Sequence, residues 1–539
     1  MSNVADQSSG GTSITETLQS LLVAFVIAMT FRGFFVEGFV IPTGSMAPTL
    51  MGAHLRFRSP ETGYEFPIDA GPVVESARAV AAGVAPARLW RIYDPMLGFS
   101  GPVASEATAA LAPQARMGDR VLVLKFLYPF SEPGRWDVVV FKNPTDPVGD
   151  TQNYIKRLVG LPEEELLLAD GDVFAGPPGT AVEDLEVQRK PEYIQRSVWQ
   201  PVHDSDFIPV NPMRLAQEWR RPYEGPPWRG AGWDLGGDRV WRRGKVDPSV
   251  LEWDWDALPI DDRVAYNMFR PVQPFYPVSD LRVAAAVEAD APRDLVTSLG
   301  LGARSHLFLF ELGEGKARLS IRHVEEDPAS PPLLTKEFEV ELPDSGAFDL
   351  EFWHVDQAMS IWIDGEEVAR LEYAWGPIER LDAALFARTL EQYERDPVTA
   401  IPAPPRLEWR FAGSPLAMRR VRVDRDLYYR PMRMQGLDRG PDGRELPDLG
   451  FGCDPRAPAV LGPDQFLMLG DNSAASRDSR VWGFPHPLAA IRTGEDAPFV
   501  VPRPLMLGKA WCVYFPAPLP FKPGGPAVIP DFGRVRFIR

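Results

Sequence analysis

The stretch Ile41-Pro42-Thr43-Gly44-Ser45-Met46-Ala47-Pro48-Thr49-Leu50 decides how the first part of the chain folds. Prolines and a glycine around one serine exclude a helix and predict a bent, extended segment. Gly44 leaves room for another backbone to approach closely. The hydroxyl of Ser45 would then be held on a rigid loop, as a nucleophile requires. An ordinary structural turn would explain the same residues, so the prediction of a nucleophile needs a base elsewhere in the chain.

An apolar run lies directly before this segment. Leu21 to Thr30 is uninterrupted, and Leu18 to Val36 is long enough to cross the hydrocarbon core of a membrane, which takes about 20 helical residues. We therefore expect a transmembrane anchor, with a cleavable secretory signal and a buried core helix as the alternatives. Residues 1–14 contain no lysine or arginine and Arg32 follows the run, so the positive-inside rule favours the orientation opposite to an exocytoplasmic catalytic domain.

A candidate base lies in Asn153-Tyr154-Ile155-Lys156-Arg157-Leu158-Val159-Gly160-Leu161-Pro162, which is typical of a strand. Strand alternation places Tyr154 and Lys156 on one face, and Ile155 and Arg157 on the other. If the face of Lys156 turns inward, desolvation lowers the lysine pKa by roughly 2–3 units and leaves a useful neutral fraction. Arg157 is expected to stay solvated. A surface lysine at a strand end is the alternative interpretation.

A polar segment closes the set: Gly470-Asp471-Asn472-Ser473-Ala474-Ala475-Ser476-Arg477-Asp478-Ser479-Arg480-Val481-Trp482-Gly483. The three segments resemble three motifs of bacterial type I signal peptidases. These motifs read P-S/T-G-S-M-x-P-T-L after a membrane span, Y-I-K-R-x-x-G-x-P in a strand, and G-D-N-x-x-x-S-x-D-S-R-x-x-G downstream. The resemblance covers roughly residues 15–55, 117–176 and 463–516.

The resemblance implies a Ser/Lys dyad that needs no cofactor. Ser45 would be the nucleophile and Lys156 the general base, with Thr43 Oγ and the Ser45 N–H holding the oxyanion and Ser476 orienting the lysine. The supporting residues would be Asp471, Asn472, Asp478 and Arg480, the last two as a charge-assisted pair. The residues that match small, alanine-accepting substrate pockets are Phe39, Ile41, Met46, Leu50, Tyr154 and Ile155.

The expected fold is mainly β: an N-terminal transmembrane helix, a signal-peptidase-type β catalytic core and an inserted β-sandwich. Short alternating strands and the Asp364-Gly365 turn predict the sandwich. Its stretch from Phe348 to Glu372 is similar to a concanavalin/laminin-G-like jelly roll. The predicted divisions are a tail (1–14), the anchor (15–38), the first part of the core (39–176, with an insert at 56–116), an irregular insert (177–264), the sandwich (265–428) and the second part of the core (429–539).

Composition excludes several other classes of protein. The net charge of −17 argues against general nucleic-acid binding, which relies on a basic surface. The six histidines and two cysteines show no metal-ligand spacing, so no metal site is predicted. The turn Ser59-Pro60-Glu61-Thr62-Gly63-Tyr64 looks like a metal ribbon that lacks its cysteines, and no zinc is predicted there. Cys453 and Cys512 could form a disulfide or remain free thiols.

These observations predict a membrane-bound serine endopeptidase that removes N-terminal signal peptides from exported pre-proteins. The predicted location is the cytoplasmic membrane, crossed once, with the catalytic domain on the exocytoplasmic (periplasmic) side. The expected partners are signal peptides and the lipid bilayer, with a glycan or a protein as a candidate ligand of the sandwich and no nucleic acid. The alternative is a membrane-tethered binding or scaffold protein whose peptidase core is vestigial.

Overall fold

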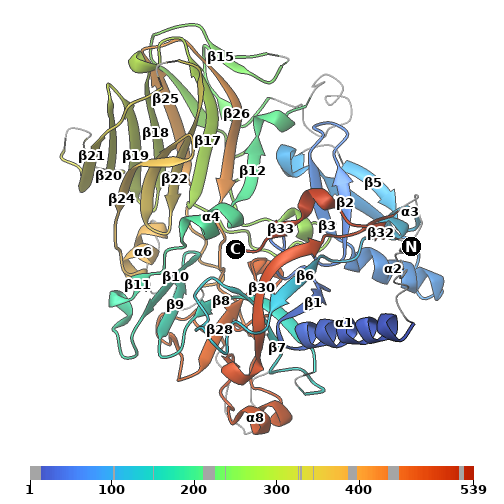
Figure 1. Cartoon of the computed structure of the whole chain (residues 1–539). Coiled ribbons are helices and arrows are strands. Elements are labelled where there is room, and N and C mark those ends of the chain that lie inside the picture. Colours follow the sequence, from blue (N-terminus) through green and yellow to red (C-terminus); the bar gives the residue numbers. More distant parts are fainter. Residues whose placement is uncertain are drawn as a thin grey trace, which may run out of the picture.

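The computed structural model describes residues 14–100, 103–149, 151–209, 225–236, 238–325, 327, 330–343, 345–385, 397–434, 448–520 and 527–539. Strands dominate the chain, as Figure 1 shows, so the prediction of a mainly β protein is confirmed. A sandwich lies at one end, a smaller β region that carries the predicted dyad lies below it, and a module built from the early insert lies beside both.

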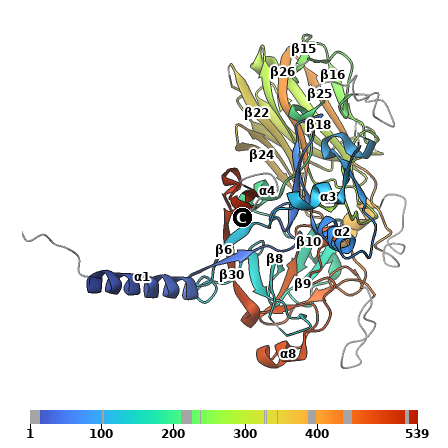
Figure 2. The same ribbon diagram turned by 90° about the vertical axis from the view of Figure 1, so that its right-hand side faces the viewer.

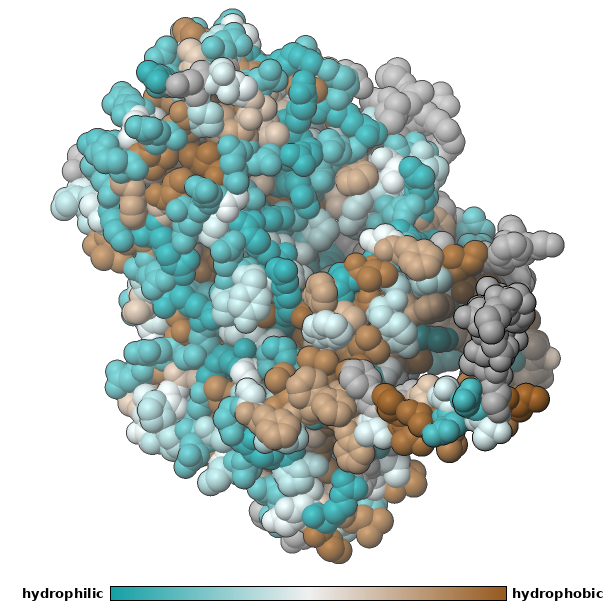
Figure 3. Space-filling model, viewed as in Figure 1, coloured by the Kyte–Doolittle hydropathy of each residue, from teal (hydrophilic) through white to brown (hydrophobic). Residues whose placement is uncertain are grey.

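Helix α1 (Ile14–Phe34) projects away from the rest of the molecule, as Figure 2 shows. It is long and apolar enough to cross a membrane, and none of its most apolar stretch is buried against the protein. In Figure 3 the part of this helix next to the rest of the molecule is brown, and hydrophilic residues interrupt the brown toward its start. The helix ends earlier than the predicted anchor, because Val36–Val40 form strand β1 and pair with residues 120–124. The aromatic and β-branched residues after Gly33 favour that strand.

One antiparallel sheet brings together the early and late parts of the chain. Its strands follow the order β1, β6 (Arg120–Leu124), β30 (Met506–Phe515), β7 (Val138–Lys142), β8 (Asn153–Gly160), β28 (Gln465–Leu469) and β29 (Val501–Pro502), and β33 (Arg536–Phe537) pairs with β30. One apolar cluster around Val121 and Val140 and another around Phe141 and Met468 cover its faces. The sheet thus fixes the predicted base strand, β8, between segments from both ends of the chain.

A smaller sheet continues from this one toward the sandwich. Its strands follow the order β11 (Glu186–Val187), β10 (Asp172–Gly176), β9 (Glu165–Ala169) and β27 (Ala459–Val460). Helices α4 (Glu192–Val198) and α6 (Pro377–Ala384) contribute buried side chains to the clusters that pack against it. Helix α8 (Pro487–Thr493) lies at the opposite end of the catalytic region, as Figure 1 shows.

The inserted region folds as two antiparallel sheets that enclose one large apolar core. The first sheet runs β14 (Asp234–Leu235), β15 (Trp241–Arg243), β26 (Leu416–Arg425), β17 (Leu281–Ala289), β22 (Ala347–Val355), β23 (Ala358–Ile363) and β24 (Glu366–Glu372), with β12 (Gln200–Asp204) also beside β26. The second runs β13 (Trp228–Arg229), β16 (Ser249–Trp253), β25 (Arg406–Ala412), β18 (Val296–Ala303), β19 (His306–Gly313), β20 (Lys316–His323) and β21 (Leu334–Glu339).

Two details of the sandwich bear on the sequence predictions. The Asp364-Gly365 hairpin is confirmed: both residues have positive φ, 50° and 84°, which suits the twist of the strands they join. The prediction that residues 177–264 are irregular is wrong for the described residues, because β12 to β16 complete the two sheets. Their tryptophans and prolines gave no period-2 pattern, and only pairing with β25 and β26 shows them to be strands.

The early insert forms a module of its own. It contains β2 (His54–Arg58), β3 (Glu65–Asp69), α2 (Gly71–Ala81), β4 (Leu89–Tyr93), β5 (Val103–Ala107) and α3 (Thr108–Leu111). Near the end of the chain, β31 (Leu519–Pro520) and β32 (Ala527–Ile529) form a separate short pair. The small core of the module also receives Ala265, Met268 and Phe269. The structure therefore places residues 265–269 against this module, whereas the sequence assigned them to the sandwich.

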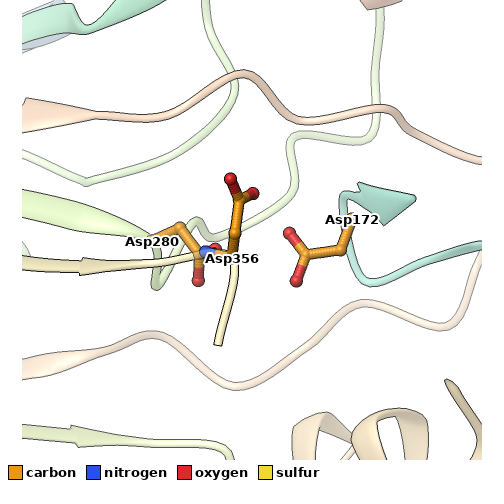
Figure 4. Close-up of side chains that lie close together, drawn as sticks. All are labelled: Asp172, Asp280 and Asp356. Carbon is orange, nitrogen blue, oxygen red and sulfur yellow. The ribbon is translucent and has the colours of Figure 1, made fainter. Parts of the chain in front are cut away.

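A buried group of charges connects the sandwich to the smaller sheet. Figure 4 shows the side chains of Asp172, Asp280 and Asp356 close together, and one carboxylate oxygen of each lies within 4.8 Å of the other two. Each carboxylate has a basic partner: Arg380 for Asp172, Arg304 for Asp280 and Lys190 for Asp356. Burial raises the pKa of Asp172 well above its usual value. The cluster is thus a structural charge network that already contains its own cations.

Candidate active site

The predicted nucleophile loop, residues 41–51, is held at both ends by one carboxylate-bearing residue. Ile41 N donates to the carbonyl of Asp119 at 2.9 Å, and Asp119 N donates to the carbonyl of Met51 at 2.8 Å. Met51 N also donates to Asp119 Oδ2 at 3.1 Å. A Cβ on Gly118 would lie 1.8 Å from the carbonyl oxygen of Ile41, so only glycine fits there. Gly118 and Asp119 therefore set the path of the loop that carries Ser45.

The structure brings Ser45 and Lys156 into contact. Nζ of Lys156 lies 2.7 Å from Ser45 Oγ and donates to the carbonyl of Ile155 at 3.1 Å. The lysine side chain is buried on the face of β8 that it shares with Tyr154, as alternation predicted. Burial lowers the pKa of Lys156 to about 8, although the nearby carboxylates of Asp478 and Asp471 oppose that shift. A substantial fraction of the amine is then neutral near pH 8 and able to accept a proton.

Arg157 differs from its prediction, because it is fully buried instead of solvated. Its guanidinium binds Asp471 through two hydrogen bonds, Nε to Oδ1 at 2.8 Å and Nη2 to Oδ2 at 2.7 Å. Asp471 Oδ2 also accepts from Thr49 Oγ1 at 2.5 Å. The base strand, the closing segment (residues 470–483) and the nucleophile loop are thus joined through one carboxylate. The opposite face of β8 is covered by the second half of the core, which the local pattern around Arg157 does not indicate.

The closing segment contains the ion pair that the sequence predicted. Arg480 Nη2 lies 2.7 Å from Asp478 Oδ2, and neither side chain is exposed. Asp478 Oδ2 also accepts from the backbone N–H of Gly470 at 3.0 Å, and Arg480 Nη1 donates to Ser473 Oγ at 2.8 Å. The pair therefore ties the two ends of the segment together next to the dyad.

Ser476 is close to the dyad but does not make the contact that was predicted for it. Its Oγ is buried and has no hydrogen-bond partner among the described residues. The amine of Lys156 instead bonds to Ser45 and to the carbonyl of Ile155. A Cβ on Gly470 would meet Ser476 Oγ at 2.2 Å and the carbonyl of Ser45 at 2.4 Å, so these groups crowd around Gly470.

The predicted oxyanion donors are available. Among the described residues, the Ser45 N–H donates to no acceptor, and Thr43 is exposed with no hydrogen bond from its hydroxyl. The backbone of Thr43 packs against Gly52, where a Cβ would lie 2.3 Å from the Thr43 carbonyl carbon. Their assignment to an oxyanion remains a prediction.

The six predicted pocket residues do not form one group. Ile41, Met46, Leu50 and Ile155 belong to a single buried cluster, with Phe39 packed against it. Tyr154 lies on the other face of β8, with its ring 6.4 Å from that of Phe141 and 6.3 Å from that of Trp482. Alternation along β8 separates Tyr154 from Ile155, so these two residues cannot line the same pocket.

Trp136 lies in the turn just before β7. Its φ of 75° falls in the left-handed region that favours glycine and is uncommon for other residues. The indole is buried, and its Nε1 donates to the carbonyl of Arg189 at 3.3 Å. The carbonyl of Trp136 accepts from Arg157 Nη1 at 2.8 Å, so this turn also supports the base strand.

Comparison with protein families supports the resemblance over part of the chain. Residues 99–200 match the family model described as signal peptidase, peptidase S26. Similar curated proteins include a probable signal peptidase I-2 of Synechocystis sp., 30% identical over 90 residues (16% of this chain, 39% of that protein). A signal peptidase I of Leptolyngbya laminosa is 32% identical over 89 residues (16% and 42%), and that of Pseudomonas aeruginosa is 34% identical over 87 residues (13% and 30%).

These matches support a type I signal peptidase region over part of the chain, and a signal peptidase function in general terms. The matched segments span less than half of each of these relatives. The family model includes Lys156, whereas Ser45 and Ser476 lie outside residues 99–200. The three-dimensional contact between Lys156 and Ser45 therefore adds information that the family match does not contain.

Some solved structures share a partial likeness with the chain. The carbohydrate binding module CBM66 from Bacillus subtilis is 8% identical and covers 37% of this chain and 95% of its own, with a TM-score of 0.21. The galectin LEC-6 of Caenorhabditis elegans is 12% identical and covers 29% and 86%, with a TM-score of 0.17. Likeness at this level carries no conclusion about a ligand.

Proposed function

We propose that this chain is a membrane-bound serine endopeptidase that cleaves N-terminal signal peptides from exported pre-proteins with a Ser45/Lys156 dyad. The observation that carries the proposal is the 2.7 Å separation of Lys156 Nζ and Ser45 Oγ in a buried site. A lysine with no catalytic role normally keeps its ammonium group in water, because desolvating that charge is unfavourable. The region that matches signal peptidases includes this lysine and its strand.

The proposed reaction begins with the neutral amine of Lys156. It takes the proton of Ser45 Oγ as the oxygen attacks the scissile carbonyl carbon, and a tetrahedral intermediate forms. The Ser45 N–H and the Thr43 hydroxyl donate hydrogen bonds to the oxyanion. When the C–N bond breaks, the lysine ammonium returns its proton to the leaving amine. The signal peptide is then held as an ester on Ser45.

Deacylation repeats the same proton movements with water. The neutral amine takes a proton from a water molecule as the water attacks the ester carbonyl, and it returns a proton to Ser45 Oγ as the ester bond breaks. No cofactor takes part in either half of this reaction. Because the same amine acts twice as a base, both halves depend on the lowered pKa of Lys156.

The membrane location follows from α1 in this proposal. The helix leads directly into β1, and the nucleophile loop follows β1 within the same run of chain. An anchor in that place holds the dyad close to the bilayer, where signal peptides of translocated proteins remain embedded. We place the catalytic domain on the exocytoplasmic side, because a signal peptide is cleaved after its protein has crossed. The charge around α1 favours the opposite orientation.

The proposal is tested with the full chain in detergent and a purified pre-protein. The wild type should release the mature protein, with cleavage at the signal-peptide boundary shown by mass spectrometry. Ser45→Ala and Lys156→Ala should each reduce cleavage by at least about 10³-fold. Matched controls are Ser131→Ala and Lys245→Ala, which remove exposed side chains of the same types. Full activity of both dyad variants would refute the mechanism, and an inactive wild type would favour a vestigial core.

A further inference from the structure

A short turn of the inserted region lies directly on the nucleophile loop. Tyr266, in the 3₁₀ turn Ala265–Asn267, is 2% exposed. Its ring covers Gly44 so closely that a Cβ there would lie 2.0 Å from Tyr266 Cε1. Its hydroxyl donates to the carbonyl of Ala53 at 2.8 Å, just beyond the loop. The residue before Ser45 is thus packed against a side chain from more than two hundred positions away.

The neighbouring residue, Asn267, pairs with the closing segment. Asn267 Nδ2 donates to Asn472 Oδ1 at 2.7 Å, and Asn472 Nδ2 donates back to Asn267 Oδ1 at 2.8 Å. Asn472 Nδ2 uses its other hydrogen on the carbonyl of Gly44, at 2.9 Å. Asn472 N donates to the carbonyl of Ser45 at 3.1 Å. Asn472, which is fully buried, therefore holds the backbone carbonyls on both sides of the Ser45 Cα.

The hydrogen bond to the Gly44 carbonyl has a consequence for the nucleophile. In a planar trans peptide the C=O and the following N–H point in opposite directions. Holding the carbonyl of Gly44 toward Asn472 therefore turns the N–H of Ser45 away from Asn472. That N–H donates to no acceptor among the described residues, and it is the proposed oxyanion donor. The direction of Asn472 Nδ2 thus decides where the oxyanion donor points.

The carbonyl of Gly44 can only accept, so it requires the Nδ2 end of the Asn472 amide. Asn267 accepts from that same Nδ2 and donates to Asn472 Oδ1, so it holds the amide of Asn472 in the orientation that the Gly44 carbonyl requires. The turn that carries Asn267 is itself fixed: Arg425 Nη2, at the end of β26, donates to the carbonyl of Arg263 at 3.0 Å. Asp262 in the same segment is paired with Arg430.

We propose that Tyr266 and Asn267 are positioning residues of the dyad, which hold the Gly44–Ser45 peptide so that the Ser45 N–H points at the oxyanion. This inference rests on the proposed function. It assigns the inserted region a part in the chemistry: the region supplies the inner support of the nucleophile loop as well as the sandwich. The catalytic region should therefore be inactive without the segment that contains these two residues.

The test compares Asn267→Ala, Asn267→Asp and Tyr266→Phe in the full chain in detergent. Cleavage of a pre-protein gives kcat and KM, and hydrogen–deuterium exchange with mass spectrometry reports on peptides that cover residues 42–53. Asn267→Ala should lower kcat by about 10- to 100-fold with little change in KM, because an oxyanion donor acts in the transition state. Exchange in the loop should become faster. Asn267→Asp keeps the acceptor for Asn472 Nδ2 and should recover part of kcat.

Three further measurements separate this inference from a general loss of structure. Gln114→Ala, which removes an exposed side-chain amide, should change neither kcat nor exchange in the loop. Asn267→Ala in an Asn472→Ala background should cause almost no further loss, since both residues act through one contact. Tyr266→Phe removes only the bond to Ala53, so it should fold normally and increase exchange at residues 50–53.

The outcomes also distinguish this inference from the proposed function. An active wild type whose kcat and loop exchange are unchanged by Asn267→Ala would overturn the inference and leave the dyad standing. Additive losses in the double variant would overturn it as well. A wild type that cleaves no pre-protein would overturn the proposed function, and with it the catalytic meaning of the contact, even where exchange shows that Asn267 holds the loop.

Discussion

Arg157 and Asp471 form a two-hydrogen-bond ion pair in which neither side chain is exposed to solvent. The two residues are 314 positions apart in the chain, and Asp471 also accepts from Thr49 of the nucleophile loop. Removing two charges from water is expensive, and their attraction offsets that cost only when the geometry is good and other hydrogen bonds are satisfied. This pair meets both conditions. It joins the base strand to the closing segment beside the dyad.

Asp471→Asn should therefore destabilise the catalytic region strongly. The variant keeps the shape of the side chain but leaves the guanidinium of Arg157 buried without a counter-charge, which typically costs about 3–5 kcal/mol. For a region of this size the apparent unfolding temperature should fall by roughly 6–20 °C. Differential scanning fluorimetry of the full chain in detergent measures the shift. Glu337→Gln, which breaks an exposed ion pair with Arg318, is the control and should shift it by no more than about 2–4 °C. Equal shifts in the two variants would contradict a special role for the buried pair.

The cleavage rate should rise with pH through the pKa of Lys156. Burial lowers that pKa to about 8, and only the neutral amine can take the proton of Ser45. Below pH 8 the rate should therefore fall about tenfold for each pH unit, and above it the rate should level off. Single-turnover cleavage at several pH values gives the midpoint. Lys156→Arg should be inactive at every pH in this range because the guanidinium stays protonated. A midpoint near 10 would mean that the lysine is solvated during the reaction.

Lys156→Met should abolish activity and yet stabilise the fold near neutral pH. The folded state holds the lysine with a pKa of about 8, against 10.5 when solvated, so below pH 8 folding must bury an ammonium. Burying the ammonium lowers the free energy of unfolding by about 3 kcal/mol, and methionine avoids this cost. The variant also loses the hydrogen bonds of the lysine, which reduces its advantage by about 1 kcal/mol.

The sign of this effect gives a second check. As pH rises from 8 toward 10.5, the unfolded wild type binds a proton that the folded protein does not, so the wild type gains stability. The advantage of Lys156→Met should thus be largest at pH 6–7 and vanish near pH 10. Unfolding temperatures of the two proteins across this pH range measure it. A difference that does not change with pH would show that the lysine is not buried as an ammonium.

Gly470→Ala should damage catalysis more than stability. The new Cβ would lie 2.4 Å from the carbonyl oxygen of Ser45, so the nucleophile must move. A misplacement of about 1 Å at the reacting atom can lower kcat about 100-fold. Gly244→Ala is the matched control, because a Cβ there meets nothing within 4 Å. If the Gly470 variant kept wild-type kcat, the loop would have more freedom than its contacts indicate.

Ser476→Ala separates the predicted role of this serine from its observed surroundings. Its buried hydroxyl has no partner among the described residues, so its removal should leave the protein equally stable or stabilise it by about 1 kcal/mol. A lysine-orienting role during turnover would appear as a kcat at least about tenfold lower at that unchanged stability. Unchanged kcat would remove Ser476 from the reaction.

Much of the site follows from local patterns. The prolines around Ser45 predict a stiff loop, and alternation along β8 correctly places Lys156 beside Tyr154 and apart from Ile155. The Asp364-Gly365 turn predicts its hairpin because both residues tolerate positive φ. The burial of Arg157 does not follow from alternation, because alternation gives the face of a side chain, whereas its burial depends on what covers that face. The strands between residues 177 and 264 cannot be recognised locally, because short strands completed by distant partners carry no period of their own.

The sequence by itself determined the kinds of residue available to the site, the loop that carries Ser45, the strand that carries Lys156 and the apolar helix before them. Only the tertiary structure decided that Asp471 meets Arg157 and that Tyr266 and Asn267 support the Gly44–Ser45 peptide. The reason is physical. Backbone conformation depends on neighbours along the chain, but desolvation and the pairing of buried charges and amides depend on groups that come together only when the whole chain packs.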